Sequence, residues 1–234
     1  MPMTVYAVNI RGVESARIAP CRALLAPERA ARADRFHFEV DRVRGILGET
    51  LIRYLAVLRT GLANDRLAFA RTERGKPYLT GPAEGLHFNL SHAGDWIVCG
   101  IGEAELGVDV EHVRDREITF AGSVLSGTEY AAWQALPEAK RPVAFYRLWT
   151  LKESYAKYRG EGLYLDFKTL EAAEESDGWW TMAGDRDCIL FSRFLTSEDL
   201  LTVCAGREYR DELDQPVHRV DVEELVSFAD GKGY

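Results

Sequence analysis

Gly107-Val-Asp-Val-Glu111 is the stretch from which the architecture of this chain is best inferred. Its two valines alternate with two carboxylates, which is the pattern of a strand with one buried face. Side chains two apart on a strand point the same way, so Asp109 and Glu111 share a face while Val108 and Val110 enter the core. Strand interiors disfavour Asp, so a carboxylate in this valine-rich pattern draws attention.

Trp149-Thr-Leu-Lys-Glu-Ser-Tyr-Ala-Lys157 is the second informative stretch, and it reads as a helix. Glu153 lies one turn after Trp149 and one turn before Lys157, so these three residues line one stripe. A plain surface pair between Glu153 and Lys157 is the simplest alternative, and it would add only a few tenths of a kcal/mol. Lys152 faces another way, where a structural ion pair and a ligand contact are equally good explanations.

The two stretches together supply three carboxylates and a lysine. Carboxylates that converge beside a lysine suit a hard cation such as Mg²⁺, with a phosphate ligand on its open side. Asp109, Glu111 and Glu153 are the candidate metal ligands. The alternative is that the first two merely end a strand and the third lies on a solvated helix face. Asp-x-Glu is frequent by chance, so this pattern alone leaves both interpretations open.

The composition of the 234 residues, 47% hydrophobic and 28% charged, is ordinary for a soluble globular protein. No apolar run approaches the ~20 residues of a membrane span, and the N-terminus lacks a signal pattern, so we expect a cytoplasmic protein without a membrane partner. The cysteines are isolated and lie mostly in strand-like runs, which predicts buried, reduced thiols rather than disulfides or zinc ligands. These are Cys21, Cys99, Cys188 and Cys204.

The net charge of −8 conceals an asymmetry along the chain. Residues 1–80 hold 14 Arg and Lys against 8 Asp and Glu, a charge of +6, which leaves −14 for the remainder. An acidic total argues against general nucleic-acid binding. Most of the basic residues are arginine, whose planar fork suits phosphate, so a small polyanionic ligand on the N-terminal half is the better interpretation.

Apolar periodicity predicts an α+β chain. Strands are expected over residues 3–9, 67–70, 86–90, 96–101, 106–111, 179–182, 188–195 and 200–205. Helices are expected over residues 27–35 and 41–59, from a Ser126–Glu129 capping box onwards, and between Pro142 and Gly160.

Five separated segments of the chain form a recognisable series. They are Pro27-Glu-Arg-Ala-Ala-Arg-Ala-Asp-Arg-Phe36, Gly75-Lys-Pro77, Phe88-Asn-Leu-Ser-His92, Gly107-Val-Asp-Val-Glu111 and Trp149-Thr-Leu-Lys-Glu-Ser-Tyr-Ala-Lys157, the last continuing into Gly160-Glu-Gly-Leu163. In order and spacing they resemble the 4′-phosphopantetheinyl transferases of the surfactin type, which move the phosphopantetheine arm of coenzyme A to a carrier-protein serine. The resemblance extends from about Tyr6 to about Leu225.

The resemblance implies a particular fold. Two similar α+β halves, residues 1–105 and 106–234, would be related by pseudo-twofold symmetry and packed tightly, with the active site at their interface. A weak internal echo between Ile97-Val-Cys-Gly100 and Thr202-Val-Cys-Ala205 agrees with this, although that echo alone would not decide the matter. Members with two halves tend to be monomers, so we expect a monomer here.

The resemblance also assigns residues to coenzyme A, the co-substrate. Lys157 would lie near the transferred phosphate, and Ser91 and His92 would contact the phosphates. Lys76 and Pro77 would lie at the diphosphate or the adenine. Basic residues around the 3′-phosphate would be Arg29, Arg32 and Arg44, where members of the family commonly carry lysine at some positions.

The implied reaction is attack by the serine of an apo peptidyl or acyl carrier protein on coenzyme A, with release of 3′,5′-ADP. Mg²⁺, or Mn²⁺ in its place, would be held by the three carboxylates. Glu153 is the first choice as general base, with Glu111 acting through a metal-bound water as the second, and Lys157 completes the catalytic set. The carrier would dock near residues 112–125.

Two other functions compete at this point. A Mg²⁺-dependent hydrolase of nucleotide diphosphates would explain the carboxylates and the basic residues, but the usual glutamate-rich helix of such enzymes is absent. A non-enzymatic module that binds coenzyme A would be favoured by loss of any of the three carboxylates, and all three are present. Release of 3′,5′-ADP only with an apo carrier distinguishes the transferase from both.

Overall fold

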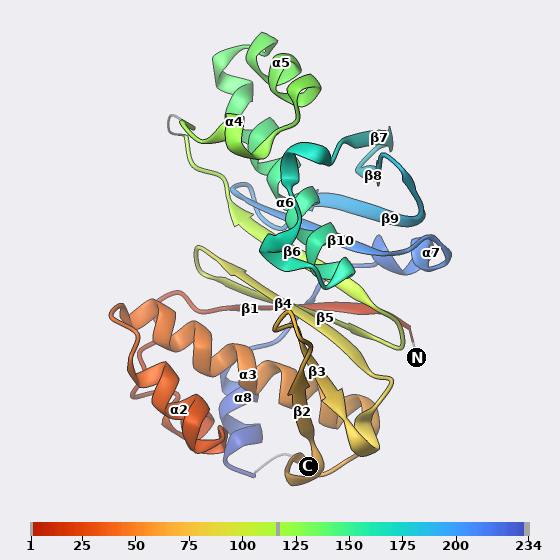
Figure 1. The fold of residues 1–234 in the computed structure, drawn as a ribbon. Coiled ribbons are helices and arrows are strands. Elements are labelled where there is room, and N and C mark those ends of the chain that lie inside the picture. The colour runs from red at the N-terminus through yellow and green to blue at the C-terminus, as the bar shows by residue number, and fades with distance from the viewer. Residues whose placement is uncertain (1, 116–117, 232–234) are drawn as a thin grey trace.

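The computed structural model describes residues 2–115 and 118–231. Its two main sheets lie one above the other, and helices cover the outer face of each (Figure 1). The predicted α+β class is confirmed. No helix in the described ranges is long and apolar enough to cross a membrane.

The first sheet has the strand order β11-β1-β5-β4. Its central strand β1 is antiparallel to β5 and parallel to β11. The bounds are β1 (Thr4–Asn9), β4 (His87–Ala93), β5 (Trp96–Gly102) and β11 (His218–Arg219).

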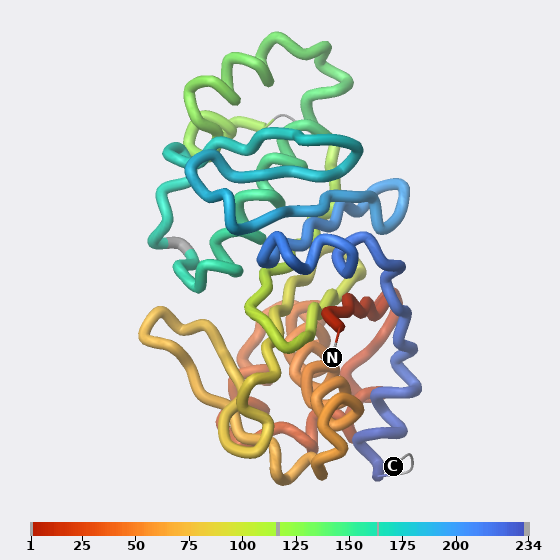
Figure 2. Tube along the Cα trace, turned by 90° about the vertical axis from the view of Figure 1, so that its right-hand side faces the viewer, coloured from red at the N-terminus to blue at the C-terminus, as the bar shows by residue number. Residues whose placement is uncertain are grey.

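The end of the chain returns to this first sheet. Helix α8 (Val222–Ala229) follows β11 and packs against α1 (Ala19–Leu24) and α3 (Glu39–Thr60). Figure 2 shows this C-terminal segment, in blue, running down along the N-terminal half. The division at residues 105 and 106 stays a prediction, but the last strand and helix pack with the first half.

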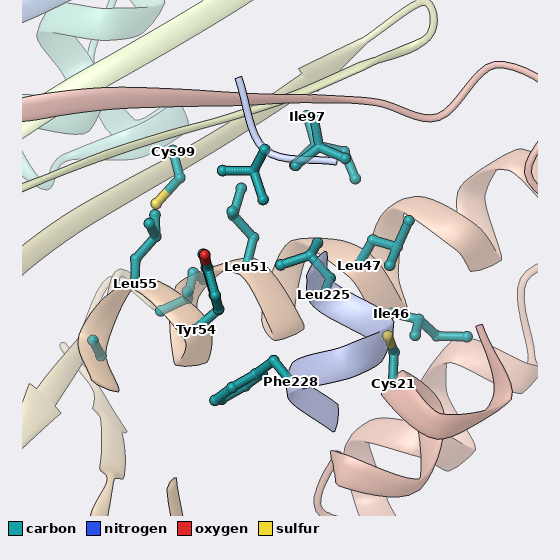
Figure 3. Packing of buried hydrophobic residues seen from close by; sticks show 14 of the residues in the cluster. Cys21, Ile46, Leu47, Leu51, Tyr54, Leu55, Ile97, Cys99, Leu225 and Phe228 are labelled. Carbon is teal, nitrogen blue, oxygen red and sulfur yellow. The ribbon is translucent and has the colours of Figure 1, made fainter. Parts of the chain in front are cut away.

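Helix α3 forms the core of this half because its apolar residues recur at helical spacing. Figure 3 shows Ile46, Leu47, Leu51 and Leu55 directed toward the sheet and α8. Complete burial of each such side chain contributes about 1.5–3 kcal/mol. Helix α2 (Pro27–Asp34) packs against α3.

A small hairpin stands apart from both sheets. It consists of β2 (Ala68–Arg71) and β3 (Pro77–Thr80), which pair with each other in an antiparallel register. The sequence predicted the first strand but only a polar turn before Pro77. Since β3 has four residues and one buried side chain, its alternation is too short to recognise.

The second sheet is antiparallel and has the strand order β6-β10-β9-β8-β7. Asp109 of β6 lies opposite Thr202 of β10. The bounds are β6 (Leu106–His112), β7 (Ala172–Ser176), β8 (Trp179–Met182), β9 (Asp185–Phe194) and β10 (Asp199–Gly206).

The remaining helices belong mainly to the second half. They are α4 (Ala121–Val124), α5 (Gly127–Ala135), α6 (Arg141–Arg159) and α7 (Arg210–Leu213). Short 3₁₀ turns occur in both halves, at η1 (Asn64–Arg66), η2 (Gly81–Ala83), η3 (Glu138–Lys140), η4 (Gly162–Tyr164), η5 (Phe167–Thr169) and η6 (Arg207–Tyr209).

Helix α6 lies directly on β6, and Gly107 makes this possible. A Cβ at Gly107 would be 1.9 Å from the carbonyl oxygen of Ser154 and 2.5 Å from the amide nitrogen of Tyr158. Because side chains two apart share a face, Asp109 and Glu111 face the same helix. Close contact at the glycine therefore brings the carboxylates of β6 under α6.

The capping box at the start of α5 is confirmed, and it has a second role. Ser126 accepts from the amide of Glu129, whose carboxylate also accepts from the buried Lys152 of α6 at 2.5 Å. The Lys152 ammonium donates to the carbonyl oxygens of Val124 and Phe167 as well. Lys152 therefore forms a structural ion pair that fixes α6 to α5.

The inner faces of the two sheets share one hydrophobic core. Val5, Ala7 and Val98 of the first sheet pack with Val108 and Val110 of the second. The predicted buried thiols are confirmed, since all four cysteines are free and buried.

Candidate active site

One pocket of about 340 Å³ gathers all the predicted catalytic residues and metal ligands. It opens where β4, β6 and α6 meet, and three carboxylates, a lysine, a histidine and a serine line it together with two apolar side chains. The lining residues are Leu90, Ser91, His92, Asp109, Glu111, Trp149, Glu153 and Lys157.

Asp109 is the most buried of the three carboxylates, with 4% of its surface exposed. Its Oδ1 accepts from Lys157 Nζ at 2.6 Å and from Ser91 Oγ at 2.8 Å. Its Oδ2 is buried and has no hydrogen-bond partner among residues 2–115 and 118–231. A buried, unpartnered carboxylate oxygen at a pocket is a natural cation ligand.

Lys157 reaches across to β6 instead of pairing along its own helix. Besides Asp109, its ammonium donates to Ser91 Oγ and to the carbonyl oxygen of Val108, each at 3.1 Å. The ion pair is therefore an inter-element contact, and the simple surface pair with Glu153 is not what the structure contains.

Glu111 and Glu153 are held in an environment that disfavours their charge. Burial and then the charge of Asp109 raise the pKa of Glu111 to about 7, partly opposed by the hydrogen bond that Trp149 Nε1 donates at 3.1 Å. Burial and the charge of Asp109 also raise the pKa of Glu153. Within this pocket Lys157 is the one fixed cation among the described lining residues, so the site is short of positive charge.

The donor set fits a divalent cation, although the side chains do not yet converge on one point. In the described parts of the chain, no group of three or more His, Cys, Asp or Glu is arranged to hold a metal ion. The fit rests on three oxygen donors lining one pocket, on the unpartnered Asp109 Oδ2 and on the charge deficit.

A second pocket of about 350 Å³ adjoins the first and shares His92, Glu111 and Trp149 with it. Phe120, Phe145 and Tyr146 give it an aromatic wall, and Arg44 lies at its edge. Burial and then the charge of Arg44 lower the pKa of His92, which keeps this histidine neutral near pH 7.

A third pocket of about 450 Å³ lies between α2, α3 and the β2–β3 hairpin. The predicted residues Arg29 and Pro77 line it, together with Arg53 and Arg71. Arg29 pairs with Glu49 at 2.6 Å. The sequence interpretation missed both additional arginines because nothing local distinguishes them from surface arginines.

Strand β4 connects the first and third pockets. Phe88 lines the third pocket, while Leu90 and His92 line the first. These positions are two apart, so their side chains share one face of the strand. Strand β4 therefore extends from the arginines of the third pocket to the carboxylates of the first.

Two predicted coenzyme A residues lie elsewhere. Arg32 is exposed on α2 and is not among the residues that line these three pockets. Lys76 Nζ pairs with Glu105 at 2.5 Å and lies 3.5 Å from the carbonyl oxygens of Leu106 and Tyr158. Lys76 thus links the hairpin to the start of β6 and the end of α6.

Trp149 has two roles in the structure, one in the core and one at the pockets. It packs against the aromatic cluster around Phe145 and also lines two pockets, where its indole donates to Glu111. A single sequence shows the helical stripe of Trp149 but not which of its edges faces the pocket.

Comparison with known proteins assigns both halves to one family. Residues 105–205 match the model of the 4′-phosphopantetheinyl transferase superfamily, and residues 15–103 match that of the 4′-phosphopantetheinyl transferase, N-terminal. A 4′-phosphopantetheinyl transferase of Bacillus subtilis is 31% identical over 208 residues, which cover 87% of this chain and 92% of the relative.

Two further relatives agree. The 4′-phosphopantetheinyl transferase psf-1 of Bacillus pumilus is 27% identical over 88% of this chain and 91% of its own length. The 4′-phosphopantetheinyl transferase Sfp of Bacillus subtilis (strain 168) is 30% identical over 67% and 69%, respectively. The chain therefore belongs to the 4′-phosphopantetheinyl transferases and is an enzyme of the Sfp type. Membership implies coenzyme A as a substrate and a carrier protein as a partner.

Proposed function

We propose that this transferase moves the 4′-phosphopantetheine arm of coenzyme A to a serine of an apo peptidyl or acyl carrier protein, releases 3′,5′-ADP and requires Mg²⁺. The observation that carries the proposal is the pocket that Asp109, Glu111, Glu153 and Lys157 line together, while Asp109 Oδ2 has no partner within the described chain. Three carboxylates with only one lysine beside them lack positive charge, and they suit a cation that also binds phosphate.

The three pockets suggest how coenzyme A would lie. The nucleotide end would occupy the third pocket, near Arg29, Arg53 and Arg71, since arginine forks suit phosphate. The diphosphate would follow β4 past His92 to the first pocket. Arg44 is proposed to contribute charge at the second pocket rather than the third.

The three carboxylates would hold Mg²⁺, or Mn²⁺ in its place. The metal ion would neutralise the charge of the diphosphate. Lys157, already 2.6 Å from Asp109, would place a further positive charge beside the transferred phosphoryl group. Ser91 holds Asp109 in place through its 2.8 Å hydrogen bond and is proposed to contact phosphate when the ligand is bound.

The transfer step would form one bond and break one at phosphorus, and would move the serine proton to a base. The serine oxygen of the carrier bonds to the β-phosphorus, and the bond between that phosphorus and the bridging oxygen breaks, so 3′,5′-ADP leaves with the electron pair. Glu153 is proposed to take the serine proton, because its raised pKa brings it nearer to neutral pH. Glu111 is the second candidate base.

The carrier is proposed to dock near residues 112–125, beside the aromatic second pocket. Phe120 is 42% exposed there and supplies apolar surface. Residues 116 and 117 of this segment lie outside the described residues. We also propose a cytoplasmic monomer whose two halves, divided near residue 105, are related by pseudo-twofold symmetry; a long helix on each sheet supports the last point.

Intact-mass measurement tests this proposal. An apo carrier domain is incubated with the enzyme, coenzyme A and Mg²⁺, beside an EDTA control. We expect a gain of one phosphopantetheine that EDTA or Asp109→Ala abolishes, while Asp187→Ala, a matched change at an exposed strand position, has no effect. Coenzyme A binding without transfer to several unrelated carriers would contradict the proposal.

A further inference from the structure

The two sheets meet along a seam where strands lie in contact without backbone pairing. Strand β4 is bonded to β5 and β6 is bonded to β10, yet β4 and β6 contact each other as the neighbouring edges of their sheets. The unpaired amides of an edge strand need partners when they are buried. The partners along the β4–β6 seam are side chains.

Side chains of alternate residues on β4 accept hydrogen bonds from alternate backbone amides of β6. Asn89 Oδ1 accepts from the amide of Val108 at 2.9 Å, and Ser91 Oγ accepts from the amide of Val110 at 3.3 Å. Both hydrogen bonds are buried. The two hydrogen bonds advance in the same chain direction on both strands, from Asn89 to Ser91 and from Val108 to Val110. The side-chain oxygens therefore take the place of the carbonyl oxygens of a parallel strand pair.

Asn89 differs from its neighbours in the same sequence segment. Ser91 and His92 line the first pocket, whereas Asn89 does not, and it is 8% exposed. The amide from which it accepts, that of Val108, nevertheless lies one residue before Asp109 along β6. A role in placing Asp109, rather than in touching substrate, is what this position allows.

We infer that Asn89 is a positioning residue for the transfer reaction, because its side-chain carbonyl fixes the register of β6 against β4 and thereby places Asp109 and Glu111 at the pocket. Strand β6 is hydrogen-bonded to β10 along its other edge, so the Asn89 contact sets where the free edge of β6 lies against β4. Without the acceptor, the Val108 amide is buried without a partner, which favours displacement of β6. This inference rests on the proposed function wherever catalysis is the readout.

The test replaces Asn89 with an isosteric residue that lacks the acceptor, Asn89→Leu. The matched control is Asn9→Leu, since the Asn9 carbonyl also accepts from a backbone amide, that of Arg11 at 3.0 Å, but at the end of β1. Asn89→Asp keeps an acceptor oxygen at the same place and serves as the rescue variant.

Three readouts are expected to move together in Asn89→Leu. Hydrogen exchange of the Val108 amide accelerates at least tenfold. The Mg²⁺ concentration that gives half of the maximal thermal stabilisation rises about tenfold, as is usual when a residue that orients a metal ligand is lost. The kcat falls about tenfold while KM for coenzyme A stays within about twofold. Asn9→Leu leaves all three unchanged, and Asn89→Asp restores protection of the Val108 amide.

Unchanged amide exchange and unchanged Mg²⁺ response in Asn89→Leu would overturn the inference. If Asn89→Leu does not fold, Asn89→Ala is measured in its place against the same expectations. Two of the measurements do not require turnover: amide exchange, and a Mg²⁺ titration that is monitored by thermal unfolding. A wild-type enzyme that transfers nothing would therefore refute the proposed function while these two measurements still decide the role of Asn89.

Discussion

At the scale of single residues, the ion pair between Lys157 and Asp109 dominates the site. Both partners are shielded from solvent, Asp109 almost fully and Lys157 largely, and they come from different elements. Removing one partner of a buried pair leaves the other charge uncompensated, and this costs more than the pair itself contributes.

Lys157→Met is therefore expected to lower the free energy of unfolding by about 3 kcal/mol at pH 7. Urea unfolding measures this change, with the exposed Lys168→Met as the matched control. Adding Asp109→Asn to Lys157→Met should recover part of the loss, because the orphaned charge is then removed. Equal unfolding free energies for Lys157→Met and Lys168→Met would show that the ion pair is immaterial.

The raised pKa of Glu111 predicts a particular pH dependence of the free energy of unfolding in metal-free buffer. Its pKa is about 7 when folded against 4.5 as the ordinary value, so the folded state binds the proton more tightly. The stabilisation is complete below about pH 4.5 and is lost as the pH rises through 7. Glu111→Gln has no such titration and keeps an acceptor for Trp149.

We expect Glu111→Gln to be more stable than the wild type by about 2–3 kcal/mol at pH 8, with the difference shrinking toward zero near pH 4.5. Chemical unfolding in EDTA across this range measures it. A stability difference that is constant over pH would contradict the raised pKa of Glu111.

At the scale of elements, the contact between β6 and α6 builds the site. The strand supplies Asp109 and Glu111, the helix supplies Glu153 and Lys157, and the distance between the two elements is set at Gly107. Backbone atoms, rather than a flexible side chain, occupy the space that a Cβ would need.

Gly107→Ala should consequently be among the most damaging small substitutions in the protein. Relieving a contact of 1.9 Å requires α6 to move away from β6. We therefore expect the free energy of unfolding to fall by at least about 3 kcal/mol and the stabilisation by Mg²⁺ to be lost. Gly127→Ala is the control, because a Cβ there meets nothing within 4 Å. Thermal unfolding of both variants measures the effect, and similar Tm values would refute the packing argument.

At the scale of the whole molecule, the chain forms its first half from both of its ends. Strand β11 pairs with β1, and α8 inserts Leu225 and Phe228 into the core beneath the first sheet (Figure 3). Sequence periodicity did not reveal this return, since β11 has two residues and α8 has eight. Such short elements carry little pattern of their own.

Leu225→Ala should therefore destabilise the N-terminal half, although residue 225 is distant from it in sequence. Leu225 is fully buried, and truncation of such a leucine typically costs about 2–5 kcal/mol. Ser227→Ala, at an exposed position of the same helix, should be neutral. Urea unfolding compares the two, and a neutral Leu225→Ala would mean that α8 does not contribute to the core.

Local patterns were sufficient wherever the backbone period alone fixes a side chain. The alternation of Val108, Asp109, Val110 and Glu111 predicted the two faces of β6, and the Ser126–Glu129 capping box predicted the start of α5. The prediction that Lys152 could be a structural ion pair is confirmed at Glu129, but its partner lies 23 residues away and was not identifiable beforehand.

The sequence by itself determined the α+β class, the long helices, the shared face of Asp109 and Glu111 and, through five separated segments, the family. Only the tertiary structure decided that Lys157 pairs with Asp109, that Lys76 pairs with Glu105 and that Asn89 serves the amide of Val108. The physical reason is that periodicity and capping depend on residues within one or two turns. Contacts between elements depend on how closely backbones approach, as at Gly107, and on which edges of the two sheets meet.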